Sequence, residues 1–563
     1  MRSWLSNYFP TVHDDMGRPS WRLTLHHGLY FVLLFVLVGA QSTSNFMMSG
    51  MTILLGSNWV LEWDFRRKFK FYHLDKKEYP GGGVGIHVHP LLLAFVVLML
   101  VHLIWLIPSQ NVDYGWHDIF KKLPLLVIPL VVLTSMPLNR KQLEWLFFTL
   151  MATVVVASVV GRVRMARMPE LPYRQVPFIS NIRFALNVAL SLLLMGWMLL
   201  RRHRQHGLRR VVSDPLVWVV VAAAAFLVDF LLRIRSYTAF AVLGVAAVVC
   251  LIVYWRRFSN KRLRNLLAIG LTLAVVATVA VSARYVHDYY APSPLRQQPL
   301  AAVTAQGNAY EHAEDGLVEN GSLVNNYVCR SELEEQWTRR STLRLTDTTA
   351  SGYSVVSTLT RYLNAKGFTK DSVGVSLLTE ADVRNIEQGV ANPVYVGGST
   401  LRQMYYVMFF EYECYRCFHA VKGFTMLQRL ELWRNAWRVY LQHPLFGVGT
   451  GDVVDACHAQ LEADRSPLAG SGIHAHNQYL TFLVAFGAVG FLLVVVAFVW
   501  ALRRERLLRL PTATAYLVML LTSFLTEDTL ETLAGAVFAV LPLCLLALYW
   551  RQMNCEDETQ RIG

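Results

Sequence analysis

Long apolar runs alternate with short polar segments along most of the chain. About twelve of these runs approach the ~20 residues that a helix needs to cross a ~30 Å hydrocarbon layer. Alternation with a period of two is scarce, so the runs predict membrane helices and not a membrane barrel. We expect helices near residues 25–40, 46–61, 89–107, 123–137, 143–160, 181–200, 215–232, 237–255, 265–282, 477–502, 512–526 and 533–550. The pattern therefore predicts an all-α polytopic membrane protein whose first helix is retained and not removed as a signal.

One polar segment is much longer than the others and runs from residue 283 to about residue 476. Its charges are mixed and nearly balanced, which is typical of a folded domain. Thr379 is a suitable N-cap, and residues 424–441 repeat apolar side chains at helical spacing. Pro444 and the glycines of HPLFGVGTGD then end that helix, and Asp452 can cap one further short helix.

The runs divide the chain into three predicted parts. Residues 1–282 form an N-terminal membrane bundle of about nine helices, residues 283–476 form a large, mainly helical loop domain, and residues 477–563 form about three C-terminal membrane helices and a tail.

The composition and charge agree with a membrane protein. The chain is 54% hydrophobic and 16% charged, whereas a soluble domain is about a quarter charged. The net charge of +14 does not indicate nucleic acid, because the basic residues gather in short loops between the apolar runs. Such loops mark the cytoplasmic side of a membrane. The basic clusters at residues 66–70, 201–210, 256–264 and 503–509 all lie on one side if both termini are cytoplasmic, which places residues 283–476 outside.

Four cysteines lie in the outer segment: Cys329, Cys414, Cys417 and Cys457. An even number in an oxidising compartment allows disulfides, and free thiols are the alternative. Cys414 and Cys417 form a CxxC, but no second CxxC completes a zinc site, so a metal is the least favoured interpretation.

Two outer loops carry positive charge where the topology rule predicts little. The loop before the sixth predicted helix contains Arg162, Arg164, Arg167, Arg174 and Arg183, and the short turn LLRIRSYTAF contains Arg233 and Arg235. Arginine can bind phosphate through two parallel hydrogen bonds, and the alternative is contact with lipid headgroups. Arg235 is favoured for a functional role because its turn is very short and joins two hydrophobic helices.

The outer turn LTEDTLETLAG supplies the acidic counterpart with Glu527, Asp528 and Glu531. These carboxylates can act as general bases or can hold arginines by pairing, and structural pairing is the favoured interpretation.

The stretch GSGIHAHNQYL places His474 and His476 where the polar segment meets an apolar run of membrane length. Polar groups at such a boundary are costly unless they are satisfied or used. An imidazole with its ordinary pKa near ~6.5 is largely neutral above that pH and can take a proton from a hydroxyl. Histidines, arginines and access from the lipid together suit a lipid-linked phosphate substrate.

At these residues the chain resembles a known family. The run RLELWRNAWRVYLQHPLFGVGTGD followed by HAHNQYLTFLVAFGAVG resembles the C-terminal half of bacterial O-antigen ligases and their polymerase relatives. IRFALNVAL, RSYTAF and TRYLNAKGFTKDSVGV resemble the branch found in Bacteroidetes-type bacteria. These motifs indicate the superfamily but separate ligase from polymerase poorly.

The resemblance implies a GT-C-like glycosyltransferase of the Gram-negative inner membrane with a periplasmic loop domain. Such enzymes move a glycan from undecaprenyl diphosphate to a sugar of the lipid A core, with inversion and without a metal or other cofactor. The essential histidine of the family corresponds to His476, and two family arginines correspond to Arg235 and Arg429. Arg183 is a further candidate for the diphosphate, and His474, Asn477, Gln478 and Glu527 are possible supporting residues.

Several alternatives remain at this point. Asn477 can cap a helix instead of supporting the reaction. The glycines of GVGTGD form either an anion-binding nest or a structural turn, and the structural turn is the favoured interpretation. A polysaccharide polymerase or a protein O-oligosaccharyltransferase would use the same lipid-linked donor. A transporter of that lipid would share the basic outer face but would not need a histidine base.

Overall fold

The computed structural model describes residues 10–12, 18–62, 71–74, 83–86, 88–168, 175–255, 261–293, 299–397, 399–471 and 475–562. The fold is mostly helical, at 72%, with almost no sheet. It forms two compact units, one of Met1–Ser259 with Leu432–Gly563 and one of Asn260–Glu431. The expected division into residues 1–282, 283–476 and 477–563 concerns the membrane and stays a prediction.

The first unit contains most of the apolar helices. They are α2 (Trp21–Ala40), α3 (Asn45–Glu62), α5 (Pro90–Ile104), α6 (Val112–Lys122), α7 (Pro124–Thr134), α8 (Arg140–Arg167), α9 (Asn181–Val212), α10 (Pro215–Arg233), α11 (Tyr237–Tyr254), α21 (Val453–Ala463), α22 (Gln478–Arg504), α23 (Pro511–Thr526) and α24 (Leu533–Ile562), with the short 3-10 helices η3 (Leu507–Arg509) and η4 (Thr529–Glu531). The strands β1 (Phe71–Leu74) and β2 (Gly83–Ile86) pair antiparallel, with Phe71 opposite Ile86.

Eight helices of the described residues are long and apolar enough to cross a membrane: α2, α8, α9, α10, α11, α12 (Lys261–Tyr290), α22 and α24. Each of the twelve predicted ranges does contain a helix, but α3 is not among the eight, α5 and α23 are shorter apolar helices, and α7 has 11 residues with Pro129 inside. A multi-pass membrane protein is therefore supported, whereas the count of about twelve crossings stays a prediction.

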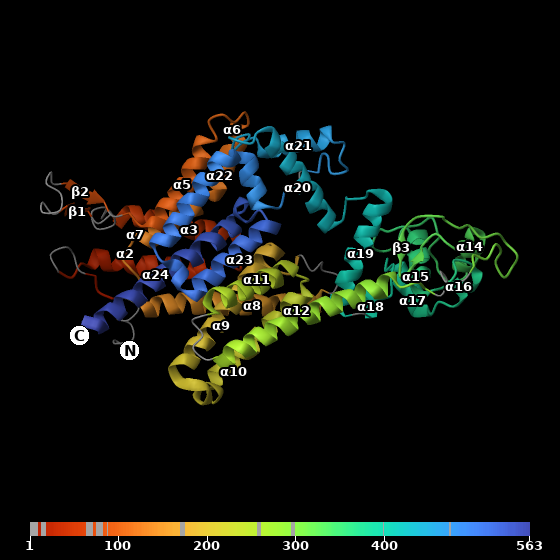
Figure 1. Cartoon of the computed structure of the whole chain (residues 1–563), viewed down its shortest axis with the longest axis horizontal. Helices are drawn as coiled ribbons and strands as arrows, with labels where there is room; N and C mark the ends of the chain where they lie inside the picture. Colours follow the sequence, from red (N-terminus) through yellow and green to blue (C-terminus); the bar gives the residue numbers. More distant parts are fainter. Residues whose placement is uncertain are drawn as a thin grey trace. The chain divides into compact units, whose positions relative to one another are not determined.

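The core of the first unit is built around α24, whose residues from Ala534 to Tyr549 are almost all buried. Helix α24 packs against α7 and α23, and α22 packs along α5. Figure 1 shows α22 beside α5, with α6 at one end of this pair. Helix α6 was not predicted, although Asn111 caps its start and lysines occupy its last turn, which are ordinary helix signals.

Helix α22 is broken at Gly487, where φ is 62° and ψ is −169°. In an unbroken helix the N–H groups of Ala488 and Val489 would bond to the carbonyls of Val484 and Ala485. Here those N–H groups instead donate to the carbonyls of Pro444 and Leu445, at 2.8 and 3.0 Å.

The two freed carbonyls of α22 are also satisfied by the loop before α21. The N–H groups of Val448 and Gly449 donate to the carbonyls of Val484 and Ala485 at 2.9 and 3.0 Å. Irregular backbone at membrane depth is tolerated only when its polar groups are bonded within the protein, and four hydrogen bonds achieve this here. The motifs HPLFGVG and FGAVG therefore bind each other.

The rest of the glycine loop is tied to the end of α5. The N–H of Thr450 donates to the Trp105 carbonyl at 3.0 Å, and the N–H of Gly451 donates to Ser109 Oγ at 3.0 Å. The Asp452 carboxylate accepts the N–H groups of Gln110 and Asn111 just before α6. These N–H groups are used within the protein, so the structural turn is confirmed over the anion-binding nest.

The second unit contains α12, the strands β3 (Val318–Glu319) and β4 (Ser322–Leu323), and the helices α14 (Arg330–Thr338), α15 (Val355–Lys366), α16 (Ser372–Ser376), α17 (Glu380–Glu387), α18 (Val394–Gly397), α19 (Thr400–Phe418) and the start of α20 (Thr425–Gln442). Thr379 caps α17 through a capping box with Asp382, which confirms the predicted helix start. Trp337 and Tyr362 lie in a buried core. Cys329, Cys414, Cys417 and Cys457 are free thiols in this structure, so the predicted disulfides are not formed there.

Candidate functional site

The start of α22 carries the histidine that the sequence singles out. His476 has left-handed backbone geometry, with φ at 49°, which is uncommon and costly for a residue other than glycine. The next residue, Asn477, caps α22, because its Oδ1 accepts the N–H of Leu480 at 3.1 Å. Asn477 Nδ2 also donates to the carbonyl of Leu525 in α23, at 3.1 Å. The cap therefore fixes the helix start against α23 and, with the turn at His476, sets where the imidazole lies.

Two buried carboxylates face the His476 imidazole. The Nδ1 atom lies 3.5 Å from Asp528 Oδ1 and 4.0 Å from Glu527 Oε2. The side chains of Glu527 and Asp528 are 3% and 8% exposed, whereas that of His476 is 36% exposed. The imidazole thus has one edge against buried negative charge and remains accessible to a substrate.

Arg183 at the start of α9 balances part of this charge. Its guanidinium lies 3.5 Å from Glu527 Oε2 and 3.7 Å from Asp528 Oδ1. Its Nε donates to Thr532 Oγ1 at 3.1 Å, and one terminal nitrogen donates to the Asp528 carbonyl at 3.2 Å. Arg183 is buried. The favoured interpretation of Glu527 and Asp528, pairing with an arginine, is therefore confirmed.

This arrangement suits general-base chemistry. With a proton on Nδ1, facing the carboxylates, the Nε2 atom of His476 is left to accept a proton from a hydroxyl. The carboxylates would then stabilise the imidazolium that forms. His476, Glu527 and Asp528 also each offer one ligand atom, all within 4.8 Å of one another, which is a spacing that can hold a metal ion. The guanidinium of Arg183 already supplies a positive charge at the two carboxylates.

Gln478 connects the start of α22 to the turn that carries Asp528. Its Nε2 donates to Glu531 Oε1 at 2.9 Å, and its Oε1 accepts the N–H of Leu530 at 2.7 Å. Gln478 is fully buried. Gln478 therefore holds the acidic turn against the start of α22, and a supporting role for it in the reaction stays a prediction.

Sequence reasoning missed a lysine on α6 that reaches this turn. Lys122 Nζ lies 2.7 Å from Glu531 Oε2 and 2.6 Å from Asp118 Oδ2. Its side chain is 4% exposed, which is rare for lysine without a charged partner. The available sequence signal was a lysine in the last turn of a capped amphipathic stretch, and this signal does not reveal a partner more than 400 residues away.

The Asp118 carboxyl has an unusual environment in this group. Burial raises its pKa from 3.8 to about 7, Lys122 opposes this rise, and the nearby Glu531 adds to it. For Glu531, burial acts in the raising direction, but the attraction of Lys122 lowers the pKa overall. Of the two carboxylates that share one lysine, Asp118 is thus the one that takes up a proton first.

The other predicted residues are distributed differently. Arg235 is exposed and has a left-handed φ of 51°, and the carbonyl of the preceding Ile234 accepts a hydrogen bond from Asn181, two residues before Arg183. The turn of Arg235 therefore borders the helix end that carries Arg183. Arg429 lies near the start of α20, in the part of that helix that belongs to the second unit, and is half-buried. His474 and Arg174 lie outside the described residues.

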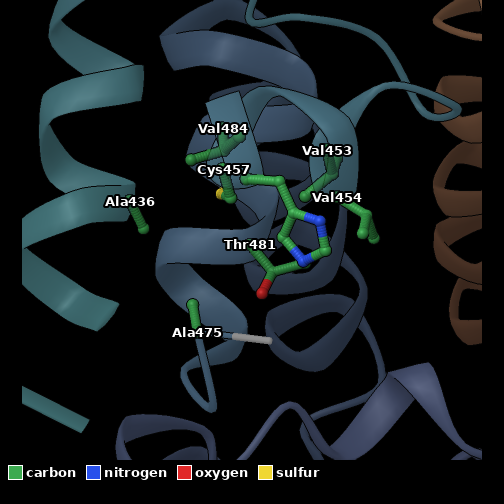
Figure 2. Close-up of a pocket in the computed structure, with 8 residues that line it drawn as sticks. Ala436, Val453, Val454, Cys457, Ala475, Thr481 and Val484 are labelled. Carbon is green, nitrogen blue, oxygen red and sulfur yellow. The ribbon is translucent and has the colours of Figure 1, made fainter. Parts of the chain in front are cut away.

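A hollow adjoins the residue before His476. Figure 2 shows it lined by Ala436 of α20, Val453, Val454 and Cys457 of α21, Ala475, and Thr481 and Val484 of α22, and His458 of α21 completes the lining. It has about 330 Å³ of empty space, including its open side. Most of its lining is aliphatic, which suits hydrocarbon, and the imidazole of His458 adds a polar group.

Comparison with known families adds one finding. Residues 389–495 match the family model described as O-antigen ligase. The match covers less than half of the chain, and it includes α20, α21, His476 and the break in α22. No curated protein matches the chain significantly. The match supports the O-antigen ligase superfamily and a ligase- or polymerase-type function in general.

Proposed function

We propose that the protein is an O-antigen ligase-type glycosyltransferase of the inner membrane. It moves a glycan from undecaprenyl diphosphate to a lipid A-core sugar at the periplasmic face. One observation carries this proposal. His476 belongs to the family-matched segment, and its imidazole lies beside the buried carboxylates of Glu527 and Asp528, which follow that segment in the chain.

In the proposed reaction, Nε2 of His476 takes the proton of an acceptor hydroxyl. The hydroxyl oxygen then attacks the anomeric carbon, and the bond from that carbon to the diphosphate breaks with inversion. The leaving diphosphate keeps the electron pair of the broken bond, and Arg235 and Arg429 are proposed to bind its negative charge. Asp528 and Glu527 hold the imidazole and stabilise its protonated form.

Arg183 takes a more specific place in this proposal than in the sequence analysis. Its guanidinium is within ion-pairing distance of both carboxylates. We propose that it holds them beside His476 and reduces their negative charge, so that the diphosphate is not repelled. Its role as a direct diphosphate ligand stays a prediction.

The decisive experiment is transfer by the purified protein in detergent with only donor and acceptor added. Wild-type protein should transfer the glycan, a chelator should not change the rate, and His476→Ala should lose at least ~100-fold in rate while remaining folded. A folded His476→Ala variant with full activity would remove the base from the mechanism. If the folded wild-type protein transfers no glycan in this assay, the result would favour a transporter.

The products of a deletion strain distinguish a ligase from a polymerase. A strain that lacks the ligase should accumulate full-length polymer that is still attached to its lipid carrier. A strain that lacks a polymerase should instead show lipopolysaccharide with single repeat units, and this result would overturn the ligase assignment.

A further inference from the structure

A chain of buried polar contacts leads from α6 to the start of α22. Lys122 Nζ lies 2.7 Å from Glu531 Oε2, and the other oxygen of Glu531 accepts Gln478 Nε2 at 2.9 Å. Gln478 in turn accepts the N–H of Leu530 through its own Oε1, at 2.7 Å. One lysine therefore holds the turn that carries Asp528 and, through Gln478, the helix start that follows His476.

A buried ion pair that includes a lysine is not an effective way to increase the stability of a fold. Removing an ammonium and a carboxylate from water costs several kcal/mol each, and an apolar pair of similar size is often at least as stable. A charged contact does fix direction and distance more closely than apolar packing does. A second hollow, distinct from that in Figure 2, is lined by Lys122 and Glu531 together with Asp118 and Tyr114 of α6, His102 of α5 and other residues.

We propose that Lys122 is a positioning residue for the reaction at His476, acting through Glu531 and Gln478. This inference rests on the proposed glycosyl transfer. Lys122 holds η4 against α6, so that Asp528 stays at its distance from the imidazole. Without the lysine, η4 loses its attachment to α6, and the carboxylates and His476 no longer keep one geometry.

Asp118 provides a matched control for this proposal. It contacts Lys122 as closely as Glu531 does, but it lies on the same helix as Lys122, and towards Glu531 of η4 it presents a second carboxyl group and not a positive charge. Asp118→Asn removes one ion pair and leaves in place the contact of Lys122 with Glu531 and that of Glu531 with Gln478. Lys122→Met breaks the connection, and Lys122→Arg keeps the charge and a donor.

The test measures kcat and the KM values for donor and acceptor in detergent, for protein that elutes as a folded species. Lys122→Met should lower kcat about 10-fold with little change in either KM, Lys122→Arg should recover most of the loss, and Asp118→Asn should stay within about twofold of wild type. Because Lys122→Met leaves Glu531 without its lysine, the double variant Lys122→Met/Glu531→Gln is included. It leaves no unpaired charge at that contact and should also lose about 10-fold in kcat.

Two results would overturn the proposal. One is wild-type kcat in the folded double variant, and the other is an equal loss of kcat in Lys122→Met and Asp118→Asn, which would indicate general damage to α6. His476→Ala is measured in the same series. If wild type and His476→Ala behave alike, the proposed function fails, whereas a normal double variant beside an inactive His476→Ala refutes only the role of Lys122.

Discussion

At the residue scale, the contact between His476 and Asp528 gives the first prediction. Asp528→Asn removes the negative charge that lies 3.5 Å from Nδ1 and that would stabilise the protonated imidazole. We expect kcat to fall at least ~10-fold while KM for the donor stays nearly constant. Kinetics of the purified variant check this expectation.

The control for that variant is Asp113→Asn, which makes the same chemical change at an exposed position of α6. It should keep the wild-type rate. A normal kcat in Asp528→Asn would show that the carboxylate only holds Arg183 and takes no part in the reaction.

The raised pKa of Asp118 predicts how stability depends on pH. The folded protein keeps the Asp118 proton up to about pH 7, whereas the unfolded chain loses it near pH 3.8. Folding is therefore favoured by this group at pH values below its unfolded pKa, and the contribution is lost as the pH rises through about 7. Asp118→Asn imitates the neutral acid and should flatten the change in thermal stability between these two pH values.

This prediction is checked by the thermal unfolding midpoint in detergent, measured for both proteins at several pH values. Equal pH slopes for wild type and Asp118→Asn would contradict the assignment of this titration to Asp118.

The sequence could indicate His476 and the acidic turn, because polar residues at a membrane boundary are unusual. It could not indicate Lys122 as a partner of that turn. A lysine near the end of a short helix is ordinary in a sequence, and only the packing of α6 beside η4 removes it from water. For the same reason, the sequence could predict that an arginine pairs with the acidic turn, but it could not predict that Arg183 pairs with both Glu527 and Asp528.

At the element scale, the break in α22 predicts that the stability of the protein is sensitive to a single Cβ atom added at Gly487. A Cβ added at Gly487 would lie 2.3 Å from the carbonyl of Leu445, and the backbone there has a φ of +62° that other residues rarely adopt. Gly487→Ala should therefore destabilise the protein by at least ~2 kcal/mol, since either the loop or the break must move. The measurement is the thermal unfolding midpoint in detergent.

Gly244→Ala in α11 is the matched control, because a Cβ there meets nothing within 4 Å and the backbone is helical. It should leave stability unchanged or slightly raised. Equal unfolding midpoints for the two variants would mean that the loop and the helix break do not depend on each other.

Most helices could be expected from hydropathy, and the start of α17 from its capping box. The break in α22 could not, because FGAVG within a long apolar run reads as an ordinary membrane helix. The role of Gly487 is seen only in the structure, where the chain before α21 supplies hydrogen-bond partners for the backbone groups at the break. Helix α6 was not predicted because it has only 11 residues and its buried residues include Asp118 and Lys122, so the sequence shows no apolar run there.

At the scale of the whole molecule, the orientation in the membrane gives a further prediction. If both termini are cytoplasmic, alkaline phosphatase fused after residue 397 should be active, because that position lies in the predicted periplasmic segment. A fluorescent protein at the C-terminus, which does not mature in the periplasm after ordinary export, should fluoresce.

The reverse pattern of the two reporters would refute this orientation and would place His476 on the cytoplasmic side, away from the proposed acceptor. A cytoplasmic fusion after residue 255, beside a basic cluster, serves as the control for the phosphatase and should be inactive.

The general class was readable from composition and apolar runs alone, because crossing a membrane imposes a length and a polarity on each segment. The number of crossings could not be predicted in this way, since α5 and α23 are too short to be identified as spans by length, and α3 is long enough but is not among the eight candidate spans. Arg429 lies in the second unit, and its proposed role as a ligand of the diphosphate stays a prediction.

The hydrogen bonds between the glycine loop and the break in α22 also bear on the order of assembly. Their partners are near neighbours in the chain, so they can form as soon as the ribosome has released this segment. Trp105 Nε1, by contrast, donates to the carbonyl of Phe446 across 341 residues of sequence. During biosynthesis, the indole N–H of Trp105, just past the end of α5, therefore cannot form this bond until the last quarter of the protein has been synthesised.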